Sequence, residues 1–158
     1  MFSIPKNRKT LLFILAIGSP IAFSVWQALL NNFAVEVANF DGKEIGMLQS
    51  LREVPGFLAF TVVFLLLIIR QQNFAILSLI ILGIGTALTG FFPSMLGLYI
   101  TTVTMSIGFH YLETLRSSLS LQWLSKEEAP RVLGKLLSVH SVSTVSYTHL
   151  TLPTILLV

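Results

Sequence analysis

The chain has 158 residues, of which 54% are hydrophobic and 11% are charged, and its formal net charge is +3. Its mean hydropathy is +0.82, far above that of a soluble domain, which could not bury so much apolar surface in water. The sequence has no cysteine, which excludes a disulfide framework and a thiolate metal site. The composition therefore predicts an all-α membrane protein in which the positions of the charges matter more than their sum.

Four apolar stretches are long enough to cross a bilayer as helices, which takes about 20 residues each. Helices are expected because lipid offers no partner to open backbone groups, and no stretch alternates in hydropathy as a barrel strand does. The breaks between the stretches are short, so neighbouring helices should be antiparallel. The predicted helices cover approximately residues 11–36, 45–69, 74–92 and 94–120.

The two ends of this series need separate interpretation. The basic and then apolar start also fits a signal peptide with a cleavage site near Ser24, but the apolar run continues past Trp26, which favours an uncleaved first helix. After the fourth helix, Glu127 and Glu128 precede Pro130, a pattern typical of a helix start. A fifth helix is therefore expected from residue 129.

Lysines and arginines are distributed unequally between the two sets of loops. If the N-terminus is cytoplasmic, Lys43 is the one basic residue of the outer loops. The inner side then holds Lys6, Arg8, Lys9, Arg70, Lys126, Arg131 and Lys135. Because cytoplasmic loops are enriched in lysine and arginine, we expect the N-terminus to be cytoplasmic and the protein to lie in a bacterial inner (plasma) membrane.

The fourth predicted helix carries three ionisable side chains at three-residue spacing. His110, Glu113 and Arg116 fall at about 0°, 300° and 240° around the helix axis, with serines in the same sector. Charged side chains in a span usually face a bundle interior or a water-filled cavity, and Glu113 and Arg116 can pair along the helix. The pattern indicates a solute or proton pathway. The alternative is that the membrane ends near Tyr111 and the pair lies at its cytoplasmic edge.

Two other predicted helices also have polar faces. Arg52 and Glu53 lie on one face of the second helix, and Gln27 and Asn31 share a face of the first. An interfacial position for the charged residues and simple helix-joining hydrogen bonds for the amides are the alternatives. Because a shared aqueous cavity requires polar faces on several helices, these four residues are predicted to join the fourth helix in lining the pathway.

Other classes of function find little support in the sequence. His110 and Glu113 could contact a metal from one helix face, but two ligands make a poor site. There is no nucleophile with a neighbouring base and no glycine-rich phosphate loop, so neither enzymatic activity nor a cofactor is expected. Nucleic-acid binding is not expected either, since no basic patch supports it.

The order of these features resembles the amino-terminal part of a major facilitator superfamily transporter. The similarity covers approximately residues 10–142 and includes the basic N-terminus, the segment DGKEIG before the second helix and EEAPRVLGK after the fourth. The family's gating loop G-x-x-x-D-R-x-G-R-K/R corresponds here to LLLIIRQQNF, which keeps Arg70. Of the fourth-helix pattern R-x-x-x-G-x-G, the chain keeps Gly108.

The resemblance implies a twelve-helix secondary transporter of two six-helix halves, with a solute site near the midplane that opens alternately to either side. Residues 1–144 would supply four helices and the start of a fifth, and the chain would lack its carboxy-terminal half and be inactive. In the intact transporter, Glu113 held by Arg116 would bind a proton or cation together with transport of a small solute.

The last residues of the chain need an interpretation of their own. The segment Val145–Thr154 resembles the translated reading frame of a sequencing adaptor, so we interpret residues 145–158 as a non-native tail in which Pro153 breaks any helix.

The alternative to the transporter is a small four-helix membrane protein that acts by assembly, as a scaffold or a dimeric exporter. Glu36, close to the outer end of the first helix, is a poor match to the membrane-embedded acid of such exporters.

Overall fold

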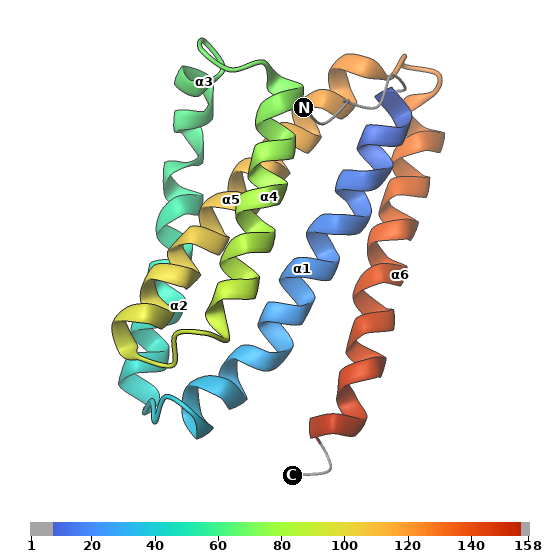
Figure 1. Ribbon diagram of the computed structural model, residues 1–158. Helices are drawn as coiled ribbons and strands as arrows, with labels where there is room; N and C mark the ends of the chain where they lie inside the picture. Colours follow the sequence, from blue (N-terminus) through green and yellow to red (C-terminus); the bar gives the residue numbers. More distant parts are fainter. Residues whose placement is uncertain (1–7, 156–158) are drawn as a thin grey trace.

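The computed structural model describes the backbone of residues 8–155 and the side chains of residues 8–145. Every regular element in this part of the chain is helical, and the antiparallel course of the long helices is visible in Figure 1. The elements are α1 (Arg8–Glu36), α2 (Gly42–Phe57), the 3-10 helix η1 (Leu58–Thr61), α3 (Val62–Leu65), α4 (Gln71–Thr89), α5 (Met95–Trp123) and α6 (Ala129–Ile155).

The four predicted spans are confirmed as helices that are long and apolar enough to cross a membrane. They are α1, the continuous segment Gly42–Leu65, α4 and α5. Much of their outer surface is apolar: the exposed fraction is 90% for Phe57, 77% for Leu121 and 69% for Leu96. Such a surface is unfavourable in water and suited to hydrocarbon, so the fold has the character of an integral membrane protein.

The second span differs from the uninterrupted helix predicted for residues 45–69. It changes from α-helix to 3-10 helix at Leu58, returns to α-helix at Val62 and ends at Leu65. Pro55 lies just before this change, and its missing N–H and its ring disturb the regular hydrogen-bond ladder. The Thr61 hydroxyl donates to the carbonyl of Leu58 over 2.7 Å and so satisfies one carbonyl of the irregular turn.

The closest helix pair is α4 and α5, whose backbones meet at two glycines. A Cβ atom added to Gly85 would lie 2.5 Å from the backbone nitrogen of Met105, and one added to Gly108 would lie 2.7 Å from the Cα of Leu82. Small residues of this kind allow membrane helices to approach closely. Gly108 is therefore required by the packing of α5 on α4.

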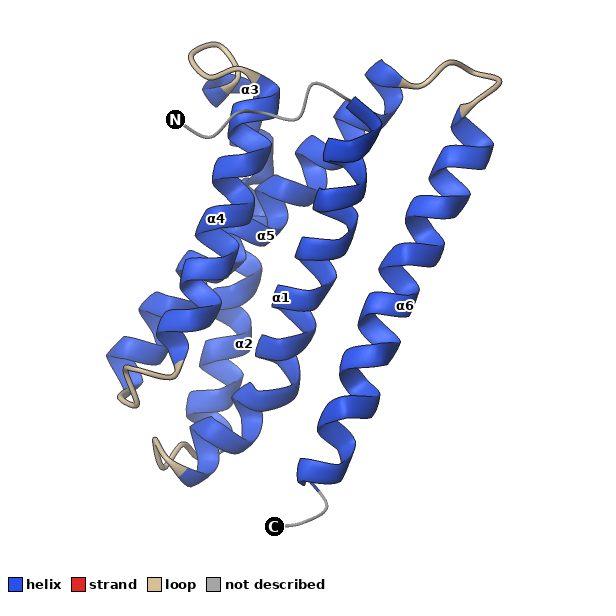
Figure 2. Cartoon of the chain, turned by 45° about the vertical axis from the view of Figure 1, so that its right-hand side comes forward, coloured by secondary structure: helices blue, strands red, loops and turns tan. Residues whose placement is uncertain are grey.

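The remaining helices flank this pair. In Figure 1, α1 lies between α4 and α6, and Figure 2 shows α6 running beside α1 at the edge of the bundle. On the other side of the bundle, α2 packs against α5. Because α6 packs mainly on α1 and touches α5 little, the α5–α6 side of the bundle is left open.

The ends of the helices are fixed by local polar contacts. Asp41 precedes α2 and accepts from the backbone nitrogens of Lys43 at 2.7 Å and Glu44 at 3.2 Å, while the Glu44 carboxylate accepts from the Asp41 backbone at 2.9 Å. This is a capping box. At the opposite end, Lys9 of α1 forms an ion pair of 2.8 Å with Glu128, just before α6.

The last helix begins at Ala129, as predicted, directly after Glu127 and Glu128. Its backbone continues through Pro153 to Ile155, so the expectation that Pro153 breaks any helix is wrong. A proline within a helix removes one hydrogen bond and opposes one carbonyl, which the long α6 accommodates near its end. The side chains of residues 146–155 and all of residues 156–158 lie outside the described part, and the origin of the tail remains a prediction.

Candidate functional site

The central feature of the polar interior is an ion pair on α5. The Arg116 Nη2 lies 2.6 Å from the Glu113 Oε2, and the exposed fractions of the two side chains are 20% and 29%. The second carboxylate oxygen, Oε1, accepts a hydrogen bond of 3.2 Å from the hydroxyl of Ser19 on α1, a residue with no exposed surface. Both oxygens of Glu113 therefore have partners, one on its own helix and one on α1.

This ion pair lies within the helical bundle rather than at a helix end. At a rise of about 1.5 Å per residue, Glu113 lies about 15 Å and Arg116 about 10 Å along α5 from its last residue, Trp123. The guanidinium of Arg8, at the start of α1, lies over the Trp123 ring at 5.8 Å from its centroid, which marks the end of the bundle. The carboxylate is thus about three helical turns deep.

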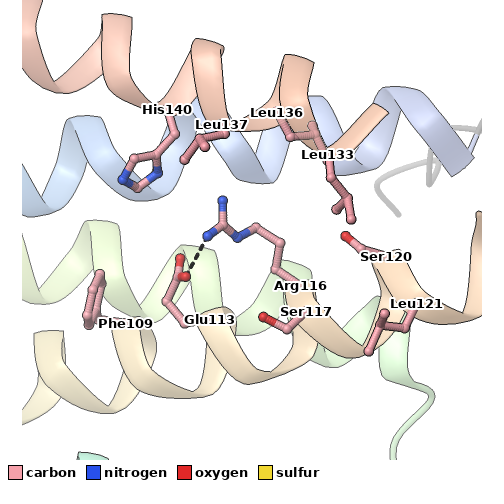
Figure 3. A pocket seen from close by; sticks show the side chains of 10 residues that line it. All are labelled: Phe109, Glu113, Arg116, Ser117, Ser120, Leu121, Leu133, Leu136, Leu137 and His140. Carbon is pink, nitrogen blue, oxygen red and sulfur yellow. Dashed lines mark hydrogen bonds and ion pairs between the residues drawn. The ribbon is translucent and has the colours of Figure 1, made fainter. Parts of the chain in front are cut away.

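A cleft of about 590 Å³ opens beside the ion pair, between α5 and α6. Figure 3 shows Glu113 and Arg116 on one wall and the side chains of α6 on the other. The lining residues are Phe109, Glu113, Arg116, Ser117, Ser120, Leu121, Leu133, Leu136, Leu137 and His140. The cleft therefore combines charged and hydroxyl groups with a larger apolar wall.

His140 of α6 is the member of this site that the sequence analysis missed. In Figure 3 its ring faces the cleft across from Glu113 and Arg116, and its Nδ1 is buried without a hydrogen-bond partner among the described residues. The signal that could have found it is helical spacing, since Leu133, Leu136 and Leu137 precede it at the intervals of a single helix face. From the sequence, this segment was predicted only as the start of a fifth helix, with no functional face.

A second polar group connects α1 and α2. The Arg52 Nη1 donates to the Gln27 Oε1 over 3.0 Å, and its Nη2 lies 2.7 Å from the Glu53 Oε1. The exposed fraction of the Arg52 side chain is 23% and that of Glu53 is 60%. The Ser106 hydroxyl of α5 donates to the backbone carbonyl of Arg52. Gln27 thus joins two helices, as the packing alternative for the amides predicted, and it also holds a charged side chain.

His110 belongs to this second group and not to the ion pair. Its ring packs against Gly56, where an added Cβ atom would lie 2.8 Å from the His110 Cε1. With Arg52, Glu53 and Ser106 it lines a cavity of about 150 Å³. The predicted polar face of α5 is therefore divided between two neighbours, with His110 toward α2 and the Glu113–Arg116 pair toward α1 and α6.

An aromatic pair stands between the two polar groups. The rings of Phe23 on α1 and Phe109 on α5 stack with centroids 4.4 Å apart and planes inclined at 22°. A third cleft, of about 470 Å³, adjoins them and is lined in part by Ser24, Gln27 and His140. Phe109 lines all three spaces, so the polar side chains of α1, α2, α5 and α6 converge around it.

Two predicted site residues lie elsewhere. Asn31 is exposed near the end of α1 and lines none of the three spaces. Arg70, the predicted gating residue, is exposed at the residue preceding α4, and its side chain does not cap that helix. The structure therefore brings together His110, Arg52, Glu53 and Gln27 in one group and Glu113 and Arg116 in another.

Within the described residues, no three histidine or carboxylate side chains lie close enough together to hold a metal ion. Comparison of the chain with protein-family models, with curated proteins and with solved structures found no match.

Proposed function

We propose that the chain is part of a secondary transporter that moves a small solute across a bacterial inner membrane by alternating access. The observation that carries the proposal is the Glu113–Arg116 ion pair, which lies about three turns inside an apolar bundle and borders the cleft between α5 and α6. Ionisable groups in such a position are costly to keep and typically mark a solute or ion pathway.

The surrounding polar groups support the same function. Four helices contribute side chains to spaces that meet at Phe109, whereas helix packing alone needs few charges. At this level, the contacts that join α1 to α5 include one polar and one aromatic contact, the Ser19–Glu113 hydrogen bond and the Phe23–Phe109 stack.

This arrangement suggests how solute movement could be coupled to an ion. Glu113 accepts from Ser19 of α1 and from Arg116 of its own helix. Binding of a proton or cation at the carboxylate would weaken its hold on Arg116 and change its contact with α1. Rocking of the α1–α6 pair against α4–α5 would then accompany ion binding and release.

The orientation follows from the basic residues. The start of α1, the start of α4 and the end of α5 lie at one end of the bundle (Figure 1), with the described residues Arg8, Lys9, Arg70 and Lys126. Lys43 lies at the other end, and Lys6 lies outside the described residues. By the positive-inside rule, the end with Arg8 is cytoplasmic in this proposal.

A cysteine-accessibility experiment tests for the water-filled path that a transporter needs. The chain has no cysteine, so single-cysteine variants require no background changes. In proteoliposomes, we expect Ser24→Cys, at the cleft beside Phe23, to react with a membrane-impermeant, positively charged methanethiosulfonate reagent. Ile21→Cys, one turn away and facing outward with an exposed fraction of 42%, is the matched control and should stay unmodified in lipid, because the reacting thiolate needs water. Equal reactivity of the two would contradict the proposal.

The larger protein implied by the resemblance needs a separate test. We propose that the intact protein has twelve helices in two halves and that residues 145–158 are a non-native tail. Long-read sequencing of the source DNA across the codon of Thr144 should show a frame that continues into about eight further spans. A gene that ends after these 158 residues would favour the small assembling membrane protein instead.

A further inference from the structure

At the polar end of the α5–α6 cleft, some hydrogen-bonding groups have partners and others have none among the described residues. Both oxygens of Glu113 accept described hydrogen bonds, from Ser19 and from Arg116. The guanidinium of Arg116, which carries five N–H groups, donates to Glu113 alone among the described residues. The cleft therefore has spare donors on Arg116 beside a carboxylate that already accepts two hydrogen bonds.

His140 adds a second unused group at the same place. Its Nδ1 is buried and has no partner among the described residues, and its ring faces Arg116 across the cleft (Figure 3). A buried polar atom without a partner is unfavourable, and an imidazole nitrogen can donate a hydrogen bond to a ligand. Rotation of the ring about its χ2 torsion would turn this nitrogen toward the cleft, so that Arg116 and His140 together flank a position for a hydrogen-bond acceptor.

The rest of the cleft is apolar. Beyond the polar end, its walls consist of Phe109 and four leucines, Leu121, Leu133, Leu136 and Leu137. Its volume of about 590 Å³ is within the range of sites that hold small organic molecules. A solute that fills it needs a hydrocarbon body as well as an acceptor at one end.

We propose that this cleft binds an amphiphilic monocarboxylate, with the carboxylate on Arg116 and His140 and the hydrocarbon along the leucine wall. Planar guanidinium and carboxylate groups form paired, charge-assisted hydrogen bonds. A cationic amphiphile is disfavoured because the Arg116 guanidinium, with its spare N–H groups, lines the cleft, and a dianion is disfavoured because it would place a second negative charge beside Glu113. This inference rests on the proposed function, since it names the class of solute that the transporter would take.

Ligand protection of a single cysteine tests the proposal on the chain itself. Ser117 lines the cleft next to Arg116, so a ligand there should shield Ser117→Cys. In nanodiscs of phosphatidylcholine, we expect octanoate to slow modification of this thiol by a methanethiosulfonate reagent about tenfold. Octyltrimethylammonium, octanol and acetate should leave the rate unchanged, because they lack the carboxylate or the hydrocarbon.

The control variants separate the carboxylate contact from a general effect of charge. Adding Arg116→Gln to Ser117→Cys should abolish protection by octanoate while the thiol still reacts. Adding Lys135→Gln, which removes a positive charge from an exposed position of α6, should leave protection intact. Loss of protection in both double variants would point to non-specific attraction of the anion and would overturn the proposal.

Three other outcomes would also overturn it. These are protection by octyltrimethylammonium equal to that by octanoate, no protection by any probe, and protection only when phosphatidylglycerol replaces phosphatidylcholine, which would assign the cleft to a lipid headgroup. The accessibility of Ser24→Cys separates this inference from the proposed function. If Ser24→Cys reacts while octanoate gives no protection, the water-filled path stands and the solute class falls.

Discussion

The two sides of α5 are built in opposite ways. Toward α4, Gly85 and Gly108 bring the two backbones into contact, and the residues between the helices are small or apolar. Toward α6, the Glu113–Arg116 pair borders a cleft of about 590 Å³. One side of the same helix is therefore closed by steric fit, and the other borders an open space that carries an ion pair.

The difference indicates which part of the molecule is rigid and which can move. A close-packed interface has little freedom, because any shift separates many atom pairs at once. The α5–α6 side, where the two helices touch little and a cleft lies between them, can change with a smaller loss. In this account, α4 and α5 form the fixed part, and the side with α1 and α6 responds to solute and ions.

The largest expected effect comes from filling the closed side. Gly85→Val should destabilise the fold by more than about 3 kcal/mol, because the new side chain meets backbone atoms that cannot yield. Gly83→Val on the same helix is the matched control, since an added Cβ at Gly83 has no atom within 4 Å and both changes have the same helix propensity. Thermal unfolding in detergent measures the difference. Similar unfolding midpoints for the two variants would refute the close contact.

Next in size is the result of breaking the ion pair on the open side. Glu113→Leu removes the ionic partner of Arg116, whose side chain has an exposed fraction of only 20%. We expect the free energy of unfolding to fall by about 2 kcal/mol. Replacing both residues, Glu113→Leu with Arg116→Leu, should restore most of the stability, because the charges contribute little to folding as a pair. Chemical unfolding of the single and double variants compares them. A double variant as unstable as the single one would mean that the pair is needed for the fold.

A smaller effect is expected at His140. Replacing it with leucine removes a buried nitrogen without a partner and extends the leucine wall, so stability should change by less than about 1 kcal/mol. The same His140→Leu change should weaken protection of Ser117→Cys by octanoate. The unfolding midpoint and the modification rate, measured on the same sample, separate the two roles. A large loss of stability with unchanged protection would assign His140 to packing.

The smallest effect concerns the end of the bundle. The hydrogen bond and charge of Lys9 hold the pKa of Glu128 below its ordinary value. Because the pKa is lowered in the folded state, the contact stabilises the fold above the ordinary pKa and is lost as the pH falls through the folded pKa. The effect should be slight, since both side chains are about half exposed. Unfolding midpoints at pH 7 and pH 3 should differ less in Lys9→Gln than in the parent and in the control Lys126→Gln. An unchanged difference in Lys9→Gln would exclude the contact as the cause.

The sequence was sufficient to predict the helices but not how they face one another. Hydropathy and length place α1, α4 and α5 because a membrane span needs a long apolar run, and the apolar face of α5 with Leu112, Leu115 and Leu119 is buried as its spacing indicates. The 3-10 turn after Pro55 was missed because a hydropathy pattern does not register a change in hydrogen bonding.

The candidate site shows the same limit. The Glu113–Arg116 pair follows from local spacing, since both residues lie on one helix. The contacts with Ser19 and the opposing ring of His140 depend on which helices become neighbours and how each is rotated. A single sequence carries no signal for which helices become neighbours. His110 was therefore grouped with Glu113, although the structure turns it toward Gly56.

The measurement that tests the central contrast most directly compares two serines, one on each side of α5. Ser117 lines the cleft, whereas the exposed fraction of Ser78, where α4 meets Gly108, is 1%. Each is changed to cysteine and exposed to a membrane-impermeant methanethiosulfonate reagent in proteoliposomes. The account predicts rapid modification of Ser117→Cys and none of Ser78→Cys. Equal rates, or an unreactive Ser117→Cys, would contradict an open polar path on one side of α5 and a closed interface on the other.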